Sequence, residues 1–325
     1  MQVLSPTTRR ATRGTMALLA TLAILPAAAA QAAAPAVSTG GATKVSPQSA
    51  TLNGTVNPKS KAAVYFFQYG PTVAYGAQTP DIGAGAGAAN VAAASDVIGL
   101  AAATTYHYRL VARNADGTTS GADRSFKTAN QPLGFSLEAS PYPALFGGAV
   151  TLQGVLSGTG NAGRQVALQQ RVFPYTADFA TIGNPQVTGS SGAFSFPLLG
   201  VTTNTQYRTI TTAGTKVTSA VVTLGVAVKV TTKISTHRVH RGHLVRFSGT
   251  ITPAKVGALF SIQKLNREGA WVTIAGGVAR GGGTAFTRYT KRIRAHRSGS
   301  YRVFVGIADG LQVSNVGAVK LITVR

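Results

Sequence analysis

The sequence predicts an all-β protein made of three tandem antiparallel β-sandwiches that follow a signal peptide. Two observations predict this: a strand pattern recurs three times, and apolar residues show no helical periodicity after residue 32. A chain of 325 residues suggests two or three domains, and its 44% hydrophobic content gives each domain enough apolar material for its own core.

The first recurring feature is a strand of alternating apolar and polar residues. It reads ATLNGTVNP at 50–58, VTLQGVLSG at 150–158 and VRFSGTITP at 245–253. In each copy a glycine follows the central Leu or Phe by two positions, and a chain breaker ends the run. Such alternation is typical of a strand with one buried face.

The second recurring feature is a tyrosine that follows the central Leu or Phe by 54, 55 and 54 residues, at Tyr106, Tyr207 and Tyr301. Chance would not keep this separation three times. We therefore expect each tyrosine ring in a core, with its hydroxyl bonded to backbone at a turn that crosses between sheets.

Residues 1–32 have the order of a secretory signal peptide. Three arginines up to Arg13 precede an apolar run, Met16–Leu25, and small residues continue to Ala32, where cleavage is expected. The alternative is a membrane anchor, but this run is shorter than the roughly 20 apolar residues that a span needs. We expect an extracellular or cell-surface protein without a membrane span after processing; the export route stays open.

The first domain is predicted at 33–129. A strand that begins near Tyr106 should enter a hairpin at Asp116–Gly117. The segment Ile82–Asn90, IGAGAGAAN, is rich in Gly and Ala, so we expect a mobile loop there.

This first domain resembles the fibronectin type III-like modules of exported bacterial proteins. The resemblance covers Val45–Thr128 and rests on VSPQSATLNGTVNP, YFFQYGPTVAYG and TTYHYRLVARNADGTTSGADRSFKT. It implies a β-sandwich without a particular ligand, because this architecture hosts many functions.

The second and third domains are predicted at 132–225 and 226–325. They resemble, less closely, immunoglobulin-like bacterial modules, and GRQVALQQR at 163–171 matches GALFSIQKL at 257–265. The segment VVTLGVAVKVTTKIS at 221–235 joins them with almost no polar spacer, so we expect a stiffer junction there than between the first two domains.

Few residues suggest catalysis. The chain has no cysteine, and its carboxylates are scattered through predicted turns: Asp81, Asp96, Asp116, Asp123, Glu138, Asp178, Glu268 and Asp309. No pair of them is spaced for general acid and base work, and no acidic loop suits calcium. We predict a protein that is not an enzyme and has no catalytic residue and no cofactor.

Two motif matches have ordinary structural interpretations. Gly158–Gly163 fits GxGxxG but lies between strands, without the strand-to-helix context of a nucleotide site, so we expect a turn. His237, His240 and His243 are spaced so that a strand would point His240 away from the other two. A solvated turn is favoured there over a metal site, although a turn at Gly242 would bring them closer.

The positive charge is concentrated at the C-terminal end. Residues 226–325 carry 17 Lys and Arg against 2 acidic residues, within a total net charge of +23. Two interpretations stay open: solvated charge on outward strand positions, or a face that binds polyanions. Under the second interpretation the candidate binding residues are Arg288, Lys291, Arg292, Arg294, Arg297 and Arg302.

We therefore expect a non-catalytic structural or adhesive protein that is secreted or held at the cell surface. The alternative function is binding of an anionic cell-wall polymer, an acidic polysaccharide or DNA through the basic C-terminal domain. The sequence does not indicate other protein partners or an oligomeric state.

Overall fold

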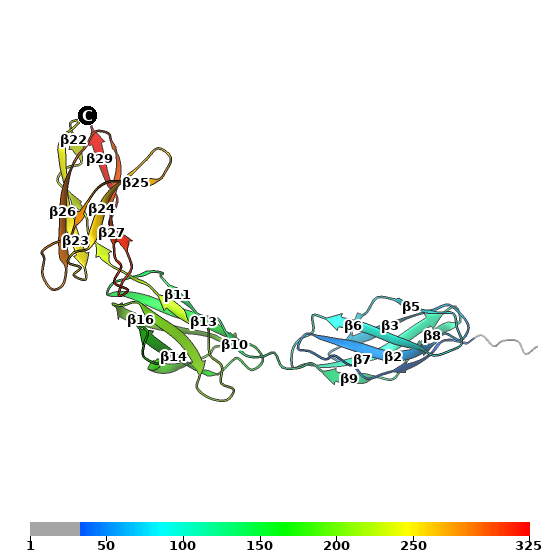
Figure 1. Cartoon of the computed structure of the whole chain (residues 1–325). Coiled ribbons are helices and arrows are strands. Elements are labelled where there is room, and N and C mark those ends of the chain that lie inside the picture. Colours follow the sequence, from blue (N-terminus) through cyan, green and yellow to red (C-terminus); the bar gives the residue numbers. More distant parts are fainter. Residues whose placement is uncertain (1–32) are drawn as a thin grey trace, which may run out of the picture. The chain divides into compact units, whose positions relative to one another are not determined.

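The computed structural model describes residues 33–325, and every regular element in this part of the chain is a β-strand (Figure 1). The signal peptide predicted at 1–32 lies outside the described residues. Within residues 33–325 the structure contains no helix long and apolar enough to cross a membrane. The all-β fold class is thus confirmed.

The chain divides into two compact units. One unit contains the described residues up to Thr43 together with Leu52–Ser95 and His107–Ser125. The other contains Lys44–Thr51, Asp96–Tyr106 and everything from Phe126 to Arg325. This division does not test the three predicted domain ranges, which stay a prediction.

The first group of strands, called here the first sandwich, forms two antiparallel sheets. One sheet has the order β1-β2-β6; the other has β4-β3-β7-β8, with β5 also paired to β3 and β9 to β7. The strands are β1 (Ala36–Thr39), β2 (Ser49–Asn57), β3 (Ala63–Gly70), β4 (Ala77–Gln78), β5 (Ile82–Gly85), β6 (Val91–Ile98), β7 (Thr105–Asn114), β8 (Gly117–Ser120) and β9 (Arg124–Lys127).

The structure corrects one prediction in this region and confirms another. The Gly- and Ala-rich segment is not entirely a loop, because Ile82–Gly85 forms strand β5, which pairs with β3 across a bulge. Small residues fit there because β5 is a short strand whose Ala84 is buried against the sheet. The predicted hairpin is present between β7 and β8, where Asn114 lies opposite Gly117.

The second sandwich contains β10 to β19. Its sheets have the orders β10-β13-β11 with β16 on β13, and β15-β14-β17-β18; β12 and β19 form a short parallel pair. The strands are β10 (Gly134–Phe135), β11 (Glu138–Ser140), β12 (Ala144–Leu145), β13 (Gly148–Ser157), β14 (Gln165–Val172), β15 (Ala180–Val187), β16 (Ala193–Val201), β17 (Thr205–Thr211), β18 (Val222–Leu224) and β19 (Val226–Ala227). Gly158–Gly163 forms the turn between β13 and β14, as predicted.

The third sandwich contains β20 to β29. Its sheets have the orders β20-β23-β21 with β26 on β23, and β22-β29-β27-β24-β25 with β28 on β27. The strands are β20 (Lys229–Val230), β21 (Lys233–Ile234), β22 (Arg238–Val239), β23 (Leu244–Thr252), β24 (Leu259–Leu265), β25 (Trp271–Val278), β26 (Thr287–Arg294), β27 (Gly299–Gly306), β28 (Asn315–Val316) and β29 (Lys320–Val324).

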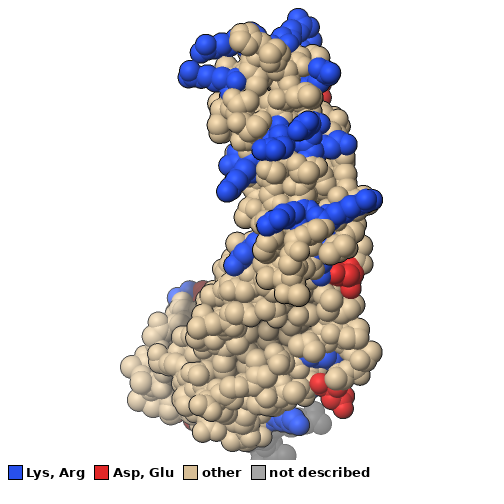
Figure 2. Space-filling view, turned by 90° about the vertical axis from the view of Figure 1, so that its left-hand side faces the viewer, with Lys and Arg blue, Asp and Glu red and all other residues tan. Residues whose placement is uncertain are grey.

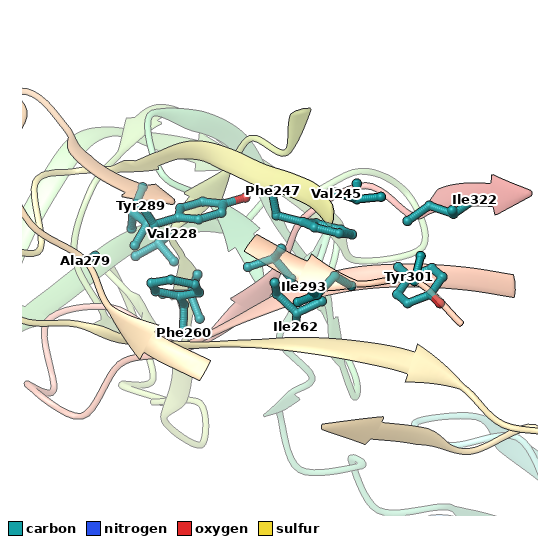
Figure 3. Close-up of a cluster of buried hydrophobic side chains, with 14 residues drawn as sticks. Val228, Val245, Phe247, Phe260, Ile262, Ala279, Tyr289, Ile293, Tyr301 and Ile322 are labelled. Carbon is teal, nitrogen blue, oxygen red and sulfur yellow. The ribbon is translucent and has the colours of Figure 1, made fainter. Parts of the chain in front are cut away.

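Alternating apolar residues from both of these sheets meet in one core (Figure 3). Phe247 of β23 and Ile293 of β26 come from one sheet, and Ile262 of β24 and Tyr301 of β27 come from the other. Burial of each such side chain contributes about 1.5–3 kcal/mol to folding. Because the core takes every second residue of a strand, the intervening residues face solvent.

The recurring glycine lies on β2, β13 and β23, where the first segment of each sandwich pairs with that strand and approaches it closely; we call this place the glycine crossing. A β-carbon on Gly154 would lie 2.0 Å from the carbonyl oxygen of Ser136, and one on Gly249 would lie 1.8 Å from that of Thr231. On Gly54 it would lie 2.6 Å from the carbonyl oxygen of Ser38. The backbones therefore approach too closely for any side chain, which explains the glycine in all three copies.

A second repeated feature was not predicted. In each sandwich an arginine donates from Nε to the Oε1 of a glutamine directly opposite on the neighbouring strand, at 2.8 Å. An aromatic ring lies under each guanidinium, with Cζ–centroid distances of 4.9, 4.1 and 4.3 Å. The three sets, called here the Gln–Arg braces, are Gln68–Arg109–Tyr75, Gln169–Arg208–Phe179 and Gln263–Arg302–Trp271.

The braces correct the predicted tyrosine repeat. Tyr207 and Tyr301 immediately precede the brace arginine, and in the first sandwich that position is Tyr108, not Tyr106. Tyr108 is fully buried and donates to the carbonyl oxygen of Gly40 at 2.6 Å. Tyr106 is only half-buried, but its hydroxyl does bond to backbone as expected, accepting from the Ala101 amide at 3.0 Å. The expected tyrosine geometry is clearest at Tyr301, which is buried and donates to the carbonyl oxygen of Arg297 at 3.1 Å.

The second and third sandwiches belong to the same compact unit and share a hydrogen-bonded junction. Asn204 Nδ2 donates to the carbonyl oxygen of Gly310, and Asn204 Oδ1 accepts from the Val226 amide, at 2.8 and 2.7 Å. Gln312 Nε2 donates to the carbonyl oxygen of Thr202 at 2.7 Å. Asn204 and Gln312 are both buried, so the short connection seen in the sequence is held by side chains from both sandwiches.

Candidate functional site

The outward side of the sheet formed by β21, β23 and β26 carries a group of basic side chains. Strand register places Arg246 directly opposite Arg292, and Lys233 opposite Ser248. Because Val245 and Phe247 point into the core, the residue between them points outward. We call this group the basic face; its members are Lys233, Arg246, Arg288, Arg292 and Arg294, and all are exposed.

No acidic side chain lies among the described outward positions of this sheet. Figure 2 shows Lys and Arg side chains over the part of the molecule that holds the third sandwich, with acidic side chains at the right-hand margin. The two acids of this sandwich are elsewhere: Glu268 lies in the turn between β24 and β25, and Asp309 pairs with Lys255. The basic face is therefore not neutralised by ion pairs from the described chain.

The ion pair of Asp309 is reflected in its acidity. Burial by itself would raise the pKa of Asp309, but the hydrogen bond and charge of Lys255, together with the backbone amides of Leu311 and Gln312, outweigh burial, and the pKa lies below its usual value. This carboxylate thus stays charged and engaged with Lys255, and it does not screen the arginines of β26.

A groove of about 700 Å³ opens on the same side of the sheet, next to the glycine crossing. Its lining combines basic, hydroxyl-bearing and other residues: Thr231, Lys233, Ser248, Gly249, Thr250, Val278, Arg280, Arg288, Tyr289 and Thr290. Tyr289 forms the floor, because its ring is buried and its hydroxyl donates to the carbonyl oxygen of Thr231 at 2.7 Å. Burial raises the pKa of Tyr289 to about 12, so it is neutral at physiological pH.

The structure brings together only some of the residues predicted for a polyanion site. Arg288, Arg292 and Arg294 share the outward side of β26. Lys291 lies opposite Phe247 on the core side of the edge strand β26, yet it is exposed. A charged residue that points inward on an edge strand discourages pairing with another chain, which gives Lys291 a structural role.

The other two predicted residues lie away from the basic face. Arg297 lies in the loop after β26, where its carbonyl oxygen accepts from Lys264 Nζ and from Tyr301. Arg302 lies on β27 in the opposite sheet and belongs to the third Gln–Arg brace. A run that is continuous in sequence is therefore distributed over both sheets and a loop.

Sequence reasoning missed Lys233 and Arg246, which belong to other strands. Arg246 lies in VRFSGTITP between two buried residues, a signal for an outward position. That Arg246 lies beside Arg292 could be found only from the register between β23 and β26. Neither Lys233 nor Arg246 has a side-chain hydrogen bond or ion pair with the described chain. The ammonium group of Lys233 and the guanidinium group of Arg246 are therefore accessible to a ligand.

The histidines show no arrangement that would hold a metal. His240 and His243 have ring centroids 5.5 Å apart, while His237 Nδ1 is 3.0 Å from the carbonyl oxygen of Leu321. Among residues 33–325 no group of three or more His, Cys, Asp or Glu could hold an ion. The carboxylates that have partners contact basic or other polar groups of the chain: Asp123 accepts from His107, which lowers the pKa of Asp123, and from the Tyr75 hydroxyl.

Comparison with known proteins finds similarity to solved structures but to no sequence family. No protein family matches the chain, and no curated protein matches it in sequence. Among solved structures, the FN1–FN3 domains of chicken CNTN1 align at 13% identity over 88% of this chain and 98% of that chain, with a TM-score of 0.30. The sensor domain of the anti-sigma factor RsgI4 of Pseudobacteroides cellulosolvens aligns at 17% identity over 29% of this chain and 89% of that chain, with a TM-score of 0.23. At these TM-scores neither likeness bears on the function.

Proposed function

We propose that the chain is an exported, non-catalytic structural or adhesive protein whose tandem β-sandwiches act at or outside the cell surface. The observation that carries the proposal is the repetition of the Gln–Arg brace. In each sandwich the arginine donates a hydrogen bond to the glutamine and lies over an aromatic ring, so these polar side chains are engaged with one another. The shared design thus supports packing and not a shared reactive site.

Export is the second part of this proposal and is supported by the order of residues 1–32. Basic residues, an apolar run and small residues follow one another as in a signal peptide. The absence of cysteine is compatible with an exported chain only if the cores suffice without disulfides. The continuous core of the third sandwich, with Phe247, Ile262 and Val303 fully buried, is of that kind.

Cells that make the protein provide the test. We expect mass spectrometry to find the chain in the surface or medium fraction, with its new N-terminus near Ala33. We also expect that loss of the gene weakens adhesion of the cells or integrity of their envelope, and that the full-length gene restores it. An unprocessed cytoplasmic protein would contradict export. Unchanged adhesion and envelope in the deletion strain would contradict the structural role, and substrate turnover by the purified chain would contradict its non-catalytic nature.

A second candidate function is favoured by a specific observation, the basic face. Its side chains have no acidic partners in the described chain, and they gather on one sheet. Such a surface would supply the attachment that an adhesive protein needs.

A further inference from the structure

We propose that the basic face of the third sandwich binds a linear polymer of phosphate groups outside the cell. The binding side chains are Lys233, Arg246, Arg288, Arg292 and Arg294, together with hydroxyl groups of the adjoining groove. The proposal names the partner of the adhesive protein proposed above. It can be tested on the purified chain, so it stands or fails separately from export and adhesion.

The second sandwich shows that the fold does not require these charges. Its sheet of β10, β11, β13 and β16 has the same register: Gly154 lies opposite Phe194 as Gly249 lies opposite Tyr289. The basic residues Lys233, Arg246, Arg288 and Arg292 are replaced there, in that order, by Glu138, Thr151, Ala193 and Pro197. Beyond Leu198 the ladder of the second sandwich has a bulge, so no residue there is paired as Arg294 is. The same backbone arrangement therefore forms with neutral or acidic side chains at these outward positions.

The charges are also not spread evenly around the third sandwich. Outward positions of the opposite sheet include Ser261, Gln263 and Phe304, and Arg302 there is held by Gln263 and Trp271. Other cations of this sandwich, such as Arg238 and Lys320, lie on the flanking strands β22 and β29 of the opposite sheet. The arginines of the basic face instead gather at outward positions of two neighbouring strands, β23 and β26, and most have no side-chain partner in the described chain. This grouping supports a function for that surface.

The spacing of the cations suits an extended chain of anions. Side chains on the same side of a strand are about 7 Å apart, and side chains directly opposite on neighbouring strands are about 5 Å apart. Arg292 therefore lies close to both Arg246 and Arg294, while Arg288 lies one further step along β26, beyond Thr290. The basic face can therefore bind several anions of an extended polymer at once. A single compact ion would contact only part of this row of cations.

Phosphate is the anion that matches the residue types. A guanidinium donates two parallel hydrogen bonds to a phosphate, and Ser and Thr hydroxyls are common additional donors. The groove next to Arg288 supplies such hydroxyls from Ser248, Thr250 and Thr290. The corresponding groove of the second sandwich, about 760 Å³, is lined by Glu138 and by no basic residue.

Other polyanions fit the face less well. Bases of single-stranded nucleic acid need aromatic platforms, but Phe247 and Tyr289 point into the core. Reading of a DNA groove needs a protruding helix or ribbon, and this face is a flat sheet. Insertion into a bilayer needs several exposed apolar residues together. The outward side of β23 has one large apolar residue, Leu244, so the face is not suited to insertion. A polymer recognised through its phosphates alone is the remaining match.

The test uses the chain of residues 33–325 and linear inorganic polyphosphate as the probe. One variant removes charge from the face: Arg246→Thr, Arg288→Ala and Arg292→Ser. The matched control removes the same charge from the opposite sheet and its hairpin: Arg238→Ser, Arg267→Ser and Lys320→Ser. We expect the face variant to bind about 10-fold or more weakly at low salt, with the slope of log affinity against log salt smaller by about 2, and the control to change little.

Competing polymers identify the anion. We expect polyphosphate to bind more tightly than polyglutamate, duplex DNA or anionic lipid vesicles at equal charge concentration. Failure to bind polyphosphate at low salt would overturn the proposal. So would equal losses in the face and control variants, which would mean that net charge alone acts. Tighter binding of polyglutamate, DNA or vesicles would replace the proposed ligand with that polymer or surface.

The second sandwich allows a complementary gain of binding. Glu138→Lys, Thr151→Arg and Ala193→Arg copy the basic residues onto the equivalent neutral face. We expect polyphosphate affinity at low salt to increase by about 10-fold, because a second cationic face becomes available. Unfolding by denaturant should change by less than about 0.5 kcal/mol per exposed substitution, which separates binding from folding. No gain in a folded variant would contradict the role of this spacing.

Discussion

The equivalent sheets of the second and third sandwiches have one backbone design and two different surfaces. β13 with β16 and β23 with β26 share the register, the crossing glycine and a buried aromatic residue opposite it. On the outward side, however, the second sheet carries Ala193 and Pro197 where the third carries Arg288 and Arg292. The core thus specifies the fold, while the outward positions are free to differ.

This difference distinguishes the residues that maintain the fold from the residues that form a binding surface. Features present in both sandwiches, such as the glycine crossing and the Gln–Arg brace, belong to folding. Features present in only one, such as the basic face, need another explanation. Three sets of substitutions sharpen this comparison, because each acts on a feature that the two sandwiches share or on one that distinguishes them.

The largest effect is expected at the shared glycine. Gly154→Ala and Gly249→Ala should each destabilise the chain by about 3 kcal/mol or more, because the new methyl group overlaps a backbone oxygen that cannot move independently. Denaturant unfolding monitored by tyrosine and tryptophan fluorescence measures the loss.

Control substitutions lie at glycines with open surroundings. An added β-carbon has nothing within 4 Å at Gly283 and only the carbonyl oxygen of Ala193, at 3.9 Å, at Gly189. Alanine at these positions should change stability by less than about 0.5 kcal/mol. A large loss in one sandwich and none in the other would show that the two crossings are not equivalent.

A smaller effect is expected at the Gln–Arg braces. Arg208→Ala and Arg302→Ala should each cost about 1–3 kcal/mol, because both lose a charged hydrogen bond and a contact with an aromatic ring. Thermal unfolding measures the cost, and Arg294→Ala on the exposed face is the control. Were Arg302→Ala to weaken polyphosphate binding more than Arg292→Ala, the assignment of Arg302 to the scaffold would be wrong.

The smallest effect is expected where the two buried aromatics differ. Tyr289→Phe introduces the residue type that the second sandwich has at Phe194, and it removes the hydroxyl that donates to the carbonyl oxygen of Thr231. We expect a loss of about 1 kcal/mol at neutral pH. Equal unfolding free energies for the variant and the parent would show that this hydroxyl contributes nothing.

The pH dependence of the same pair gives a second measurement. The pKa of Tyr289 is about 12 in the folded chain and 10.0 in an unperturbed tyrosine. Between these values the unfolded chain has lost the proton and the folded chain still holds it, so stability decreases as pH rises. Parent and Tyr289→Phe should therefore diverge above pH 10, the parent losing up to about 2–3 kcal/mol more.

Most of the fold could be predicted from alternation and repetition. The strands around Leu52, Leu152 and Phe247 were predicted because burial of every second residue leaves a visible pattern. The tyrosine equivalence was predicted two residues too early in the first sandwich. Tyr106 and Tyr108 lie on the same side of β7, so alternation cannot distinguish them; the opposite glutamine does.

The candidate site was only partly predictable, for a similar reason. Neighbours in sequence alternate between the two sides of a strand, so the basic run at 288–302 could not form one surface. Conversely, Arg246 and Lys233 reach the face from other strands, and only register places them beside Arg292 and Ser248. Sequence indicates where charge accumulates, but pairing decides which charges meet.

The junction at Asn204 and Gln312 has a mechanical consequence. Their side-chain hydrogen bonds link loops of two sandwiches in addition to the covalent connection near Val226. Tension on a polymer attached to the basic face would be shared between the main chain and these lateral bonds. Force applied to the third sandwich would therefore reach the second through side chains as well as through the backbone.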